Sequence, residues 1–224
     1  MGFQKEKYLQ LAQEIQDSHV TIVAVSKTKP IEDLKEAYDA GVRDFGENYV
    51  QELCEKQLAL PQDIRWHFIG HLQSNKVKYI APFVHLIHGV DSEKLLIEIN
   101  KQGKKLNRKI SCLLQIYIAK EETKFGMNEA ELRSTLNILP ELDYVNVCGL
   151  MGMASFSDNE QIVASEFSYL NDLFQNLNIE LQSSHRKIIY LSTGMSGDYK
   201  IALQHGSNMI RIGSLLFGER KYHQ

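Results

Sequence analysis

The sequence predicts a closed barrel of eight parallel strands, each followed by a helix. Segments rich in Val, Ile, Phe and Tyr alternate with segments of helical period along the whole chain, which is the pattern of βαβ units and a parallel sheet. About eight such strands fit into 224 residues, a usual length for one (β/α)8 barrel. An open, doubly wound sheet is the alternative, but the G-x-G-x-x-G turn that normally follows its first strand is absent from the sequence.

Eight strands and seven connecting helices are expected in alternation. The strands are expected at residues 20–26, 43–46, 65–69, 84–90, 110–118, 144–151, 187–192 and 208–212. The helices are expected at residues 31–40, 48–58, 72–80, 92–103, 128–137, 159–177 and 197–205. Capping residues support these boundaries: Pro30 in the first turn of the first helix, Gly41 after it, Asp91 or Ser92 before the fourth, and Asp158 before the sixth.

Composition narrows the class of protein. A formal net charge of −3 and a pI near 6.2 give no electrostatic reason to expect nucleic acid or an anionic membrane as a partner. The sequence has no run of 18 apolar residues that would predict a membrane span. No Pro/Gly/Ser-rich linker divides the chain, so residues 1–224 are expected to form one domain.

The cysteines and the N-terminus favour a cytoplasmic protein. Cys54, Cys112 and Cys148 are odd in number and widely separated, which argues against a disulfide framework and against a structural zinc site. The first sixteen residues place apolar side chains at helical spacing and carry charges throughout, unlike a signal peptide.

In a barrel of this type, the residues that do chemistry lie at the C-terminal ends of the strands. That criterion selects Lys27, "FGEN" 45–48, "GH" 70–71, Asp91, "TKFGM" 123–127, "MGMAS" 151–155, "STGMSGD" 192–198 and "RIGS" 211–214. The two last segments follow strands seven and eight, where phosphate sites recur in this fold. Their hydroxyl groups and backbone N–H groups suit an anion, although a polar helix cap explains residues 192–198 equally well.

Arg211 and Lys27 bring cations to the same end of the barrel. Arg211 lies within a strand, where an inward charge needs an acceptor such as a phosphate or a ring nitrogen. A salt bridge to Asp198 or Glu219 is the alternative. Lys27 across the rim suggests a phosphorylated carbonyl compound that is held as a Schiff base, and the alternative is a lysine that merely reaches water. Lys29 lies further out and is expected to flank the site or to face solvent.

Seven segments, in order along the chain, resemble one family. These are "VAVSKTKP" (23–30), "DFGENYVQE" (44–52), "WHFIGHLQSNK" (66–76), "KFGM" (124–127), "LMGMAS" (150–155), "LSTGMSGD" (191–198) and "IRIGSLLFGER" (210–220). They look like the pyridoxal phosphate homeostasis proteins, which are single-domain relatives of the alanine racemase barrel. The resemblance implies a fold-type III (β/α)8 barrel that binds pyridoxal 5′-phosphate (PLP) as an internal aldimine and takes part in vitamin B6 homeostasis.

The resemblance also assigns residues. Lys27 would form the Schiff base, and Arg211 would face the pyridine nitrogen, which restricts the chemistry that the cofactor supports. The phosphate would be held by Ser192, Thr193 and Gly194 together with Gly213 and Ser214. Asn48 and His71 would be second contacts with the ring or its 3′-oxygen. His67 is expected to be a hydrogen-bonded structural histidine, and Met127, Met151, Met153 and Met195 to fill the core.

The family favours a regulator that buffers PLP and delivers it to apo-enzymes, without catalytic residues, a metal, or a nucleic-acid or membrane partner. A PLP-dependent racemase is the alternative, and a module for another phosphorylated ligand comes third. Racemisation needs two opposed acid/base groups, and racemases supply the second from a C-terminal β domain that is not expected here. Tyr49 and Tyr199 are interpreted as rim or helix-surface residues. Without that domain, a monomer is expected.

Overall fold

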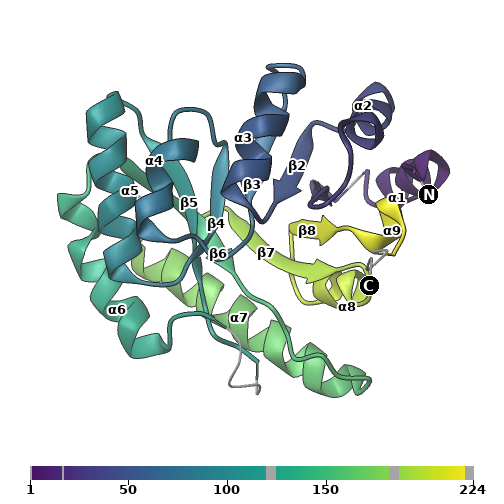
Figure 1. Cartoon of the computed structure of the whole chain (residues 1–224). Coiled ribbons are helices and arrows are strands. Elements are labelled where there is room, and N and C mark those ends of the chain that lie inside the picture. Colours follow the sequence, from purple (N-terminus) through teal and green to yellow (C-terminus); the bar gives the residue numbers. More distant parts are fainter. Residues whose placement is uncertain (1, 17, 120–124, 182–186, 220–224) are drawn as a thin grey trace.

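Eight parallel strands close into a barrel (Figure 1). We analysed a computed structural model, which describes residues 2–16, 18–119, 125–181 and 187–219. The strands are β1 (Thr21–Val25), β2 (Asp44–Glu47), β3 (Arg65–Phe68), β4 (Leu86–Val90), β5 (Ile110–Gln115), β6 (Val145–Met151), β7 (Tyr190–Met195) and β8 (Met209–Ile212). The first strand pairs with the last, with Thr21 beside Met209 and Val23 beside Arg211. This pairing confirms the barrel and excludes the open sheet.

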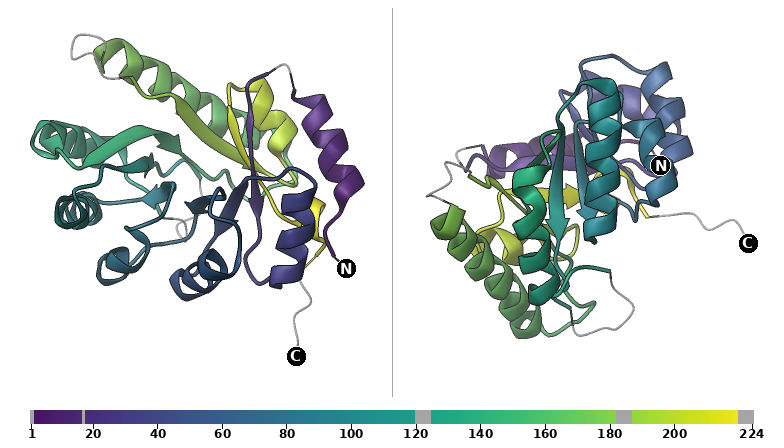
Figure 2. Two further views of the ribbon diagram at one scale, coloured as in Figure 1. Left: turned by 90° about the horizontal axis from the view of Figure 1, so that it is seen from above. Right: turned by 90° about the vertical axis from the view of Figure 1, so that its left-hand side faces the viewer.

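Helices surround the barrel on its outside (Figures 1 and 2). They are α1 (Lys5–Glu14), α2 (Ile31–Asp39), α3 (Val50–Ala59), α4 (Val77–Ile80), α5 (Glu93–Leu106), α6 (Glu129–Ile138), α7 (Glu160–Leu181), α8 (Tyr199–Gln204) and α9 (Ser214–Phe217), with 3-10 turns η1 (Ser74–Lys76) and η2 (Leu139–Glu141). All seven predicted connecting helices are present. The one expected at 72–80 is split into η1 and α4, and the sixth is preceded by Asn159, whose Oδ1 accepts from the N–H of Gln161, rather than directly by Asp158.

The end of the seventh strand differs from the prediction in a way that affects the site. The sequence predicted a strand at 187–192, but β7 begins at Tyr190 and continues to Met195. Residues 192–194 therefore lie within the strand and not in the loop that follows it. The loop begins after Met195, whose backbone N–H donates to Oδ1 of Asp198 at 2.5 Å.

The core has two layers because side chains alternate between the two faces of each strand. The outer layer fills the space between strands and helices and includes Leu34, Phe45, Phe167 and Phe217, all fully buried. The inner layer fills the barrel with a smaller apolar group: Val23, Leu86, Leu113, Cys148, Met151 and Met209. Polar side chains share that interior and are described below.

The N-terminal helix α1 packs against α9, the last helix that the structure describes. In Figures 1 and 2, α1 lies beside α9. The backbone N–H of Gln4 donates to the carbonyl oxygen of Leu216 at 2.7 Å, and the rings of Phe3 and Phe217 lie 5.5 Å apart. The turn between β8 and α9 is thereby held in place from behind.

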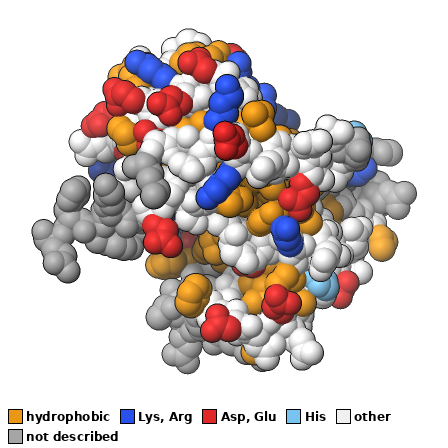
Figure 3. Space-filling view, turned by 90° about the vertical axis from the view of Figure 1, so that its right-hand side faces the viewer, with side chains coloured by type: hydrophobic (Ala, Val, Ile, Leu, Met, Phe, Trp, Pro, Cys, Tyr) orange, Lys and Arg blue, Asp and Glu red, His pale blue; other side chains and the backbone are white. Residues whose placement is uncertain are grey.

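The surface mixes charges of both signs. On the face shown in Figure 3, Lys and Arg side chains are interspersed with Asp and Glu and do not gather in a patch of one sign. Among the described residues, no helix combines the length and the apolar character needed to cross a lipid bilayer.

Candidate functional site

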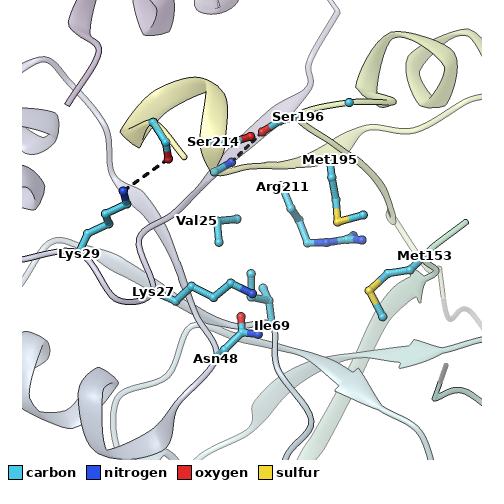
Figure 4. Close-up of a pocket in the computed structure, with 13 residues that line it drawn as sticks. Val25, Lys27, Lys29, Asn48, Ile69, Met153, Met195, Ser196, Arg211 and Ser214 are labelled. Atoms are coloured by element: carbon cyan, nitrogen blue, oxygen red, sulfur yellow. Dashed lines mark hydrogen bonds between the residues drawn. The ribbon is translucent and has the colours of Figure 1, made fainter. Parts of the chain in front are cut away.

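A cavity of about 310 Å³ opens at the C-terminal end of the barrel (Figure 4). It lies between the loops that follow β1, β2, β7 and β8. The described residues that line it are Val25, Lys27, Lys29, Asn48, Ile69, Met153, Met195, Ser196, Gly197, Arg211, Gly213, Ser214 and Gly218. Three of these are cations and none is a carboxylate, so this wall favours an anionic ligand.

Lys27 projects into the cavity from a tight turn at the end of β1 (Figure 4). The backbone N–H of Lys29 donates to the carbonyl oxygen of Ser26 at 3.1 Å, which closes this turn. Thr28 occupies the left-handed region with φ 62°, a conformation that a β-branched residue rarely adopts. Its N–H donates to Oε1 of Glu52 at 2.6 Å, and this bond holds the strained residue.

A buried polar network supports the turn from below. Ser26 donates from its hydroxyl to Oε1 of Glu47 at 2.6 Å. The Lys56 ammonium has three hydrogens to donate and finds three acceptors, the carbonyl oxygen of Ser26 at 2.7 Å, Oε1 of Glu47 at 2.8 Å and Oε1 of Glu52 at 2.7 Å. The four side chains thus fix the residues on both sides of Lys27.

Glu47 is the member of this network whose ionisation is most affected by burial. It is fully buried, and its Oε2 has no hydrogen-bond partner among the described residues. Burial raises the pKa of Glu47 to about 7, against the opposing effect of Lys56 and of the Ser26 hydroxyl. The carboxyl is therefore protonated in a large share of molecules near neutral pH.

Lys29 also lines the cavity, and its amine donates to the chain that follows β8, across the pairing of β1 with β8. Its Nζ donates to the carbonyl oxygen of Phe217 at 2.7 Å and also to that of Gly218 at 3.4 Å, the bond that is dashed in Figure 4. The predicted flanking position is confirmed. Lys29 ties the loop after β1 to the last turn of α9.

The loop after β7 and the turn after β8 meet at one hydroxyl group. Ser196 accepts at its Oγ from the backbone N–H of Gly213 at 3.1 Å and from that of Leu215 at 3.4 Å. Ser196, Gly197 and Ser214 lie together on this side of the cavity. Hydroxyls and backbone N–H groups in adjacent loops form a donor set that suits an oxyanion.

Arg211 forms one wall of the cavity (Figure 4) and is almost completely buried. Its Nη1 donates to the carbonyl oxygen of Ser192 at 2.8 Å and to the Ser192 hydroxyl at 2.7 Å, and its Nη2 donates to the carbonyl oxygen of Gly152 at 3.1 Å. Burial lowers the pKa of Arg211 to about 10, and Asp198 acts in the opposite direction. The guanidinium therefore stays charged at neutral pH, with neutral acceptors in place of the salt bridge considered from the sequence.

Asn48 presents an unsatisfied acceptor beside Lys27 (Figure 4). Its Oδ1 is buried and has no hydrogen-bond partner within the described part of the chain. A buried amide oxygen without a partner is costly. A ligand that donated a hydrogen bond here would remove that cost.

The structure brings together five of the nine residues that the sequence selected: Lys27, Asn48, Arg211, Gly213 and Ser214. It does not bring the other four to the cavity wall. Ser192 and Thr193 are buried within β7, and Gly194, with φ 88°, packs so closely against α8 that a Cβ would lie 2.7 Å from the Cβ of Ala202. These three residues lie beneath the cavity wall and do not line it.

His71 lies outside the cavity. Its Nδ1 is 3.0 Å from Oδ2 of Asp91, its ring stacks on Phe125 at 4.6 Å, and its side chain is 47% exposed. It lines a neighbouring groove on the α3 side of the barrel.

Sequence reasoning did not assign Ser196 and Gly197 to the anion side of the site. Both belong to the segment 192–198 that was selected, and the strand end placed three residues too early is the reason for the difference. Met153 and Met195 were expected to fill the core, but both line the cavity and Met195 is 41% exposed. The residues 123–124 of "TKFGM" lie outside the described residues.

The family model for the alanine racemase N-terminal domain matches residues 3–221. A pyridoxal phosphate homeostasis protein of Aquifex aeolicus is 40% identical over 202 residues, which cover 90% of this chain and 87% of that one. A protein of the same name from Schizosaccharomyces pombe is 37% identical over 214 residues, which cover 94% and 89% of the two chains.

Comparison with solved structures finds similar folds. PipY of Synechococcus elongatus PCC7942 with PLP bound superimposes with a TM-score of 0.87 and 34% identity, and the match covers 96% of this chain and 99% of PipY. An alanine racemase from Bartonella henselae superimposes with a TM-score of 0.72 and 16% identity over 94% of this chain and 57% of the racemase. The second likeness concerns the fold alone.

Proposed function

The chain belongs to the pyridoxal phosphate homeostasis proteins, within the family of the alanine racemase N-terminal domain, and from this premise we propose that it binds PLP at the C-terminal end of the barrel. One observation carries the proposal. An amine, Lys27, and two hydroxyls that suit an anion, those of Ser196 and Ser214, line opposite parts of one cavity. PLP has an aldehyde and a phosphate to match them.

Lys27 is the residue that holds the aldehyde. When bound, PLP would supply an aldehyde, and the Nζ of Lys27 would hold that aldehyde covalently. Ser26 and Thr28, fixed by the network of Glu47, Lys56 and Glu52, keep the lysine side chain directed into the cavity. The protein's contribution is therefore to present one amine in one place.

The phosphate is held by the two loops that meet at Ser196. Two hydroxyls supply donors there, those of Ser196 and Ser214, and the Ser196 oxygen is held in place by the backbone N–H of Gly213. Gly197 leaves room for close approach, since no atom lies within 4 Å of the Cβ that it lacks. Ser192, Thr193 and Gly194, which the sequence assigned to the phosphate, act behind this surface.

Arg211 and Asn48 bracket the ring. A guanidinium that stays charged beside the pyridine nitrogen donates to that nitrogen and leaves it unprotonated, which weakens the cofactor as an electron sink. The unsatisfied Oδ1 of Asn48 lies beside Lys27 in the cavity, where it would accept a hydrogen bond from a hydroxyl of the bound ligand. His71 has no place in this arrangement while it is bonded to Asp91.

The geometry favours a holder of PLP over a racemase. Racemisation requires an acid/base group on each face of the substrate carbon. Among the described residues, neither Tyr49 nor Tyr199 lines the cavity: Tyr49 lies in the neighbouring groove, and the Tyr199 hydroxyl is 3.4 Å from Oε2 of Glu14. We therefore propose a single-domain, monomeric, cytoplasmic protein that buffers PLP and delivers it to apo-enzymes, with no turnover of its own.

The first experiment compares two lysines at one rim. Wild type, Lys27→Met and Lys29→Met are incubated with PLP, desalted, and examined by visible absorbance and by borohydride reduction with mass spectrometry. We expect wild type and Lys29→Met to retain the colour and the reduced adduct, and Lys27→Met to lose both. A colourless wild type, or an adduct that persists in Lys27→Met, contradicts the proposal.

Two further measurements separate holder, racemase and delivery. Chiral chromatography after incubation with single amino-acid enantiomers should show no inversion, and inversion in proportion to protein favours the racemase. Loaded protein should activate an apo PLP enzyme faster than the matched concentration of free PLP. Equal rates would leave buffering as the function and remove delivery.

A further inference from the structure

A chain of hydrogen bonds runs through the interior of the barrel from the cavity to the opposite end. Arg211 Nη1 is 2.7 Å from Ser192 Oγ, which is 3.2 Å from His88 Nδ1. His88 Nε2 is 2.9 Å from His67 Nδ1, and His67 Nε2 is 2.9 Å from Asp44 Oδ1. Asp44 is the first residue of β2, so the chain spans the barrel from one end to the other. None of the five residues is more than 8% exposed.

The two ends of the chain determine its direction. A guanidinium has only N–H donors, so Arg211 must donate to Ser192. At the other end, burial would raise the pKa of Asp44, but hydrogen bonds from Arg65 and His67 outweigh it and lower the pKa to about 2. Asp44 is therefore an ionised acceptor at neutral pH. Arg65 fixes it with two bonds, Nε to Oδ1 at 2.7 Å and Nη2 to Oδ2 at 2.5 Å.

One arrangement of protons satisfies every link between these ends and also gives the Ser192 hydroxyl hydrogen an acceptor. His67 carries its proton on Nε2 and donates it to Asp44, which leaves Nδ1 as an acceptor. His88 then carries its proton on Nε2 and donates to His67, and its own Nδ1 accepts from the Ser192 hydroxyl. The Ser192 oxygen remains free to accept from Arg211. Each of the three middle residues gives one hydrogen bond and receives one in the same direction.

An added proton would break this order. If His67 carried a second proton on Nδ1, His88 would have to shift its proton to Nδ1 and donate toward Ser192. The Ser192 oxygen would then receive two donors, and its own hydrogen would lose the acceptor that it has in the chain. Burial is the largest of the effects that lower the pKa of His88, so this ring is neutral in either arrangement. The arrangement in which every hydrogen of the chain is bonded has two neutral histidines.

We propose that Asp44, His67, His88 and Ser192 are positioning residues for Arg211, and that this one-directional chain fixes which N–H groups the guanidinium presents to the ligand in the cavity. The ligand part of the proposal depends on the proposed binding of PLP, whereas the arrangement of protons does not. Ser192 Oγ and the carbonyl oxygens of Ser192 and Gly152 take three of the N–H groups of Arg211. The remaining N–H groups of Arg211 are thereby directed toward the ligand in the cavity.

Nuclear magnetic resonance on the ligand-free protein tests the arrangement directly. Long-range proton–nitrogen correlation of 15N-labelled protein at pH 7 reports which ring nitrogen of each histidine carries hydrogen, and His88→Asn and His67→Asn identify the signals. We expect both residues as neutral rings protonated at Nε2. A proton on Nδ1 of either ring, or a charged ring, overturns the proposal whether or not PLP binds.

PLP titration with matched serine variants tests the effect on the site. Ser168 Oγ is 2.8 Å from His205 Nδ1 outside the barrel, so Ser168→Ala removes the same kind of bond as Ser192→Ala without touching the chain. Loss of one hydrogen bond to a charged group predicts about a tenfold weaker affinity for PLP in Ser192→Ala, with a shifted absorbance maximum. Ser168→Ala should stay within about twofold of wild type.

A double-variant cycle completes the test. Because Ser192 and His88 act on Arg211 through one chain, Ser192→Ala combined with His88→Asn should weaken binding no more than Ser192→Ala alone. Additive losses, or wild-type affinity and absorbance in Ser192→Ala, overturn the positioning role. If wild type itself binds no PLP, the proposed function fails, and the histidine signals still decide the arrangement of protons.

Discussion

Replacing Glu47 by Gln tests whether the carboxyl beneath Lys27 is neutral in the folded protein. Glu47 is fully buried, and burial raises its pKa to about 7 although Lys56 Nζ lies 2.8 Å away. Glutamine preserves the shape and one acceptor but cannot ionise. The substitution therefore removes the titration and little else at a pH where the wild-type group is protonated.

The sign of the effect follows from the two pKa values. A glutamate of the unfolded chain ionises near 4.5, so between pH 4.5 and about 7 the unfolded state has released a proton that the folded state keeps. The contribution of Glu47 to stability is fully present below pH 4.5 and is lost as the pH rises toward 7, by about 1.4 kcal/mol per pH unit. From pH 5 to pH 7 the loss amounts to about 2 kcal/mol.

Urea unfolding at pH 5, 6, 7 and 8 measures this slope. We expect Glu47→Gln to match wild type within about 1 kcal/mol at pH 5 and to gain on it as the pH rises to 7. Glu52→Gln is the matched control, because it also removes a carboxylate that contacts Lys56 but leaves Glu47 in place. Burial, and not the Glu52 charge, is the main cause of the raised pKa of Glu47, so this variant should keep most of the wild-type slope. A constant gap between Glu47→Gln and wild type would refute a neutral Glu47 and identify a permanently charged pair with Lys56.

Three further substitutions have definite outcomes. Lys29→Met removes the bond to the Phe217 carbonyl oxygen and should lower the unfolding free energy by about 1 to 2 kcal/mol in urea; an unchanged midpoint contradicts the assigned tie. Gly149→Ala would place a Cβ 1.9 Å from the Tyr190 carbonyl oxygen, so we expect a loss of about 3 kcal/mol or more, and a stable variant would show that β6 and β7 separate readily. Asp44→Asn should reduce the loss of stability between pH 4 and pH 2. The lowered pKa of Asp44 contributes stability that is present above its unfolded value of 3.8 and is lost as the pH falls toward about 2. An unchanged acid slope in urea unfolding over that range would contradict this role of Asp44.

The fold could be predicted because each level of the sequence points to the same answer. The apolar segment at 20–26 and the turn at Pro30 place β1 and α2 within one residue at each end. The alternation of eight such strands with seven helices leaves a closed barrel as the natural arrangement. The limits of strands are less certain, since "YLSTGM" has small polar residues typical of a loop yet continues the ladder of β7 to Met195.

That one boundary explains most of the difference at the site. Consecutive residues of a strand point to opposite faces, so Ser192, Thr193 and Gly194 could not all face a ligand once they lay within β7. Ser192 points into the barrel toward Arg211, and the first loop hydroxyl to reach the cavity is Ser196. Lys27 and Arg211 were predicted correctly to share a site because each follows from the position of its strand alone.

The buried networks could not be predicted from the sequence. Lys56 is one of many lysines on helices, and nothing in its spacing indicates that it reaches across to Glu47 and the Ser26 carbonyl oxygen. The ring contact of His67 with His88 joins residues on β3 and β4 that are 21 positions apart. Such contacts depend on strand register and on the stagger of the barrel, which are properties of the assembled sheet.

The bond from Lys29 to Phe217 joins residues 188 positions apart, and it lies beside the pairing of β1 with β8. A nascent chain that has emerged only as far as β7 has Lys27 but lacks Arg211, Gly213 and Ser214, so it cannot yet bracket a phosphorylated ring. Contacts of such long sequence separation form late, because the intervening loop must be closed first. Ligand binding therefore raises the unfolding free energy of the closed barrel alone, by RT ln(1 + [L]/Kd). The cofactor thus stabilises only molecules that are completely synthesised and correctly closed.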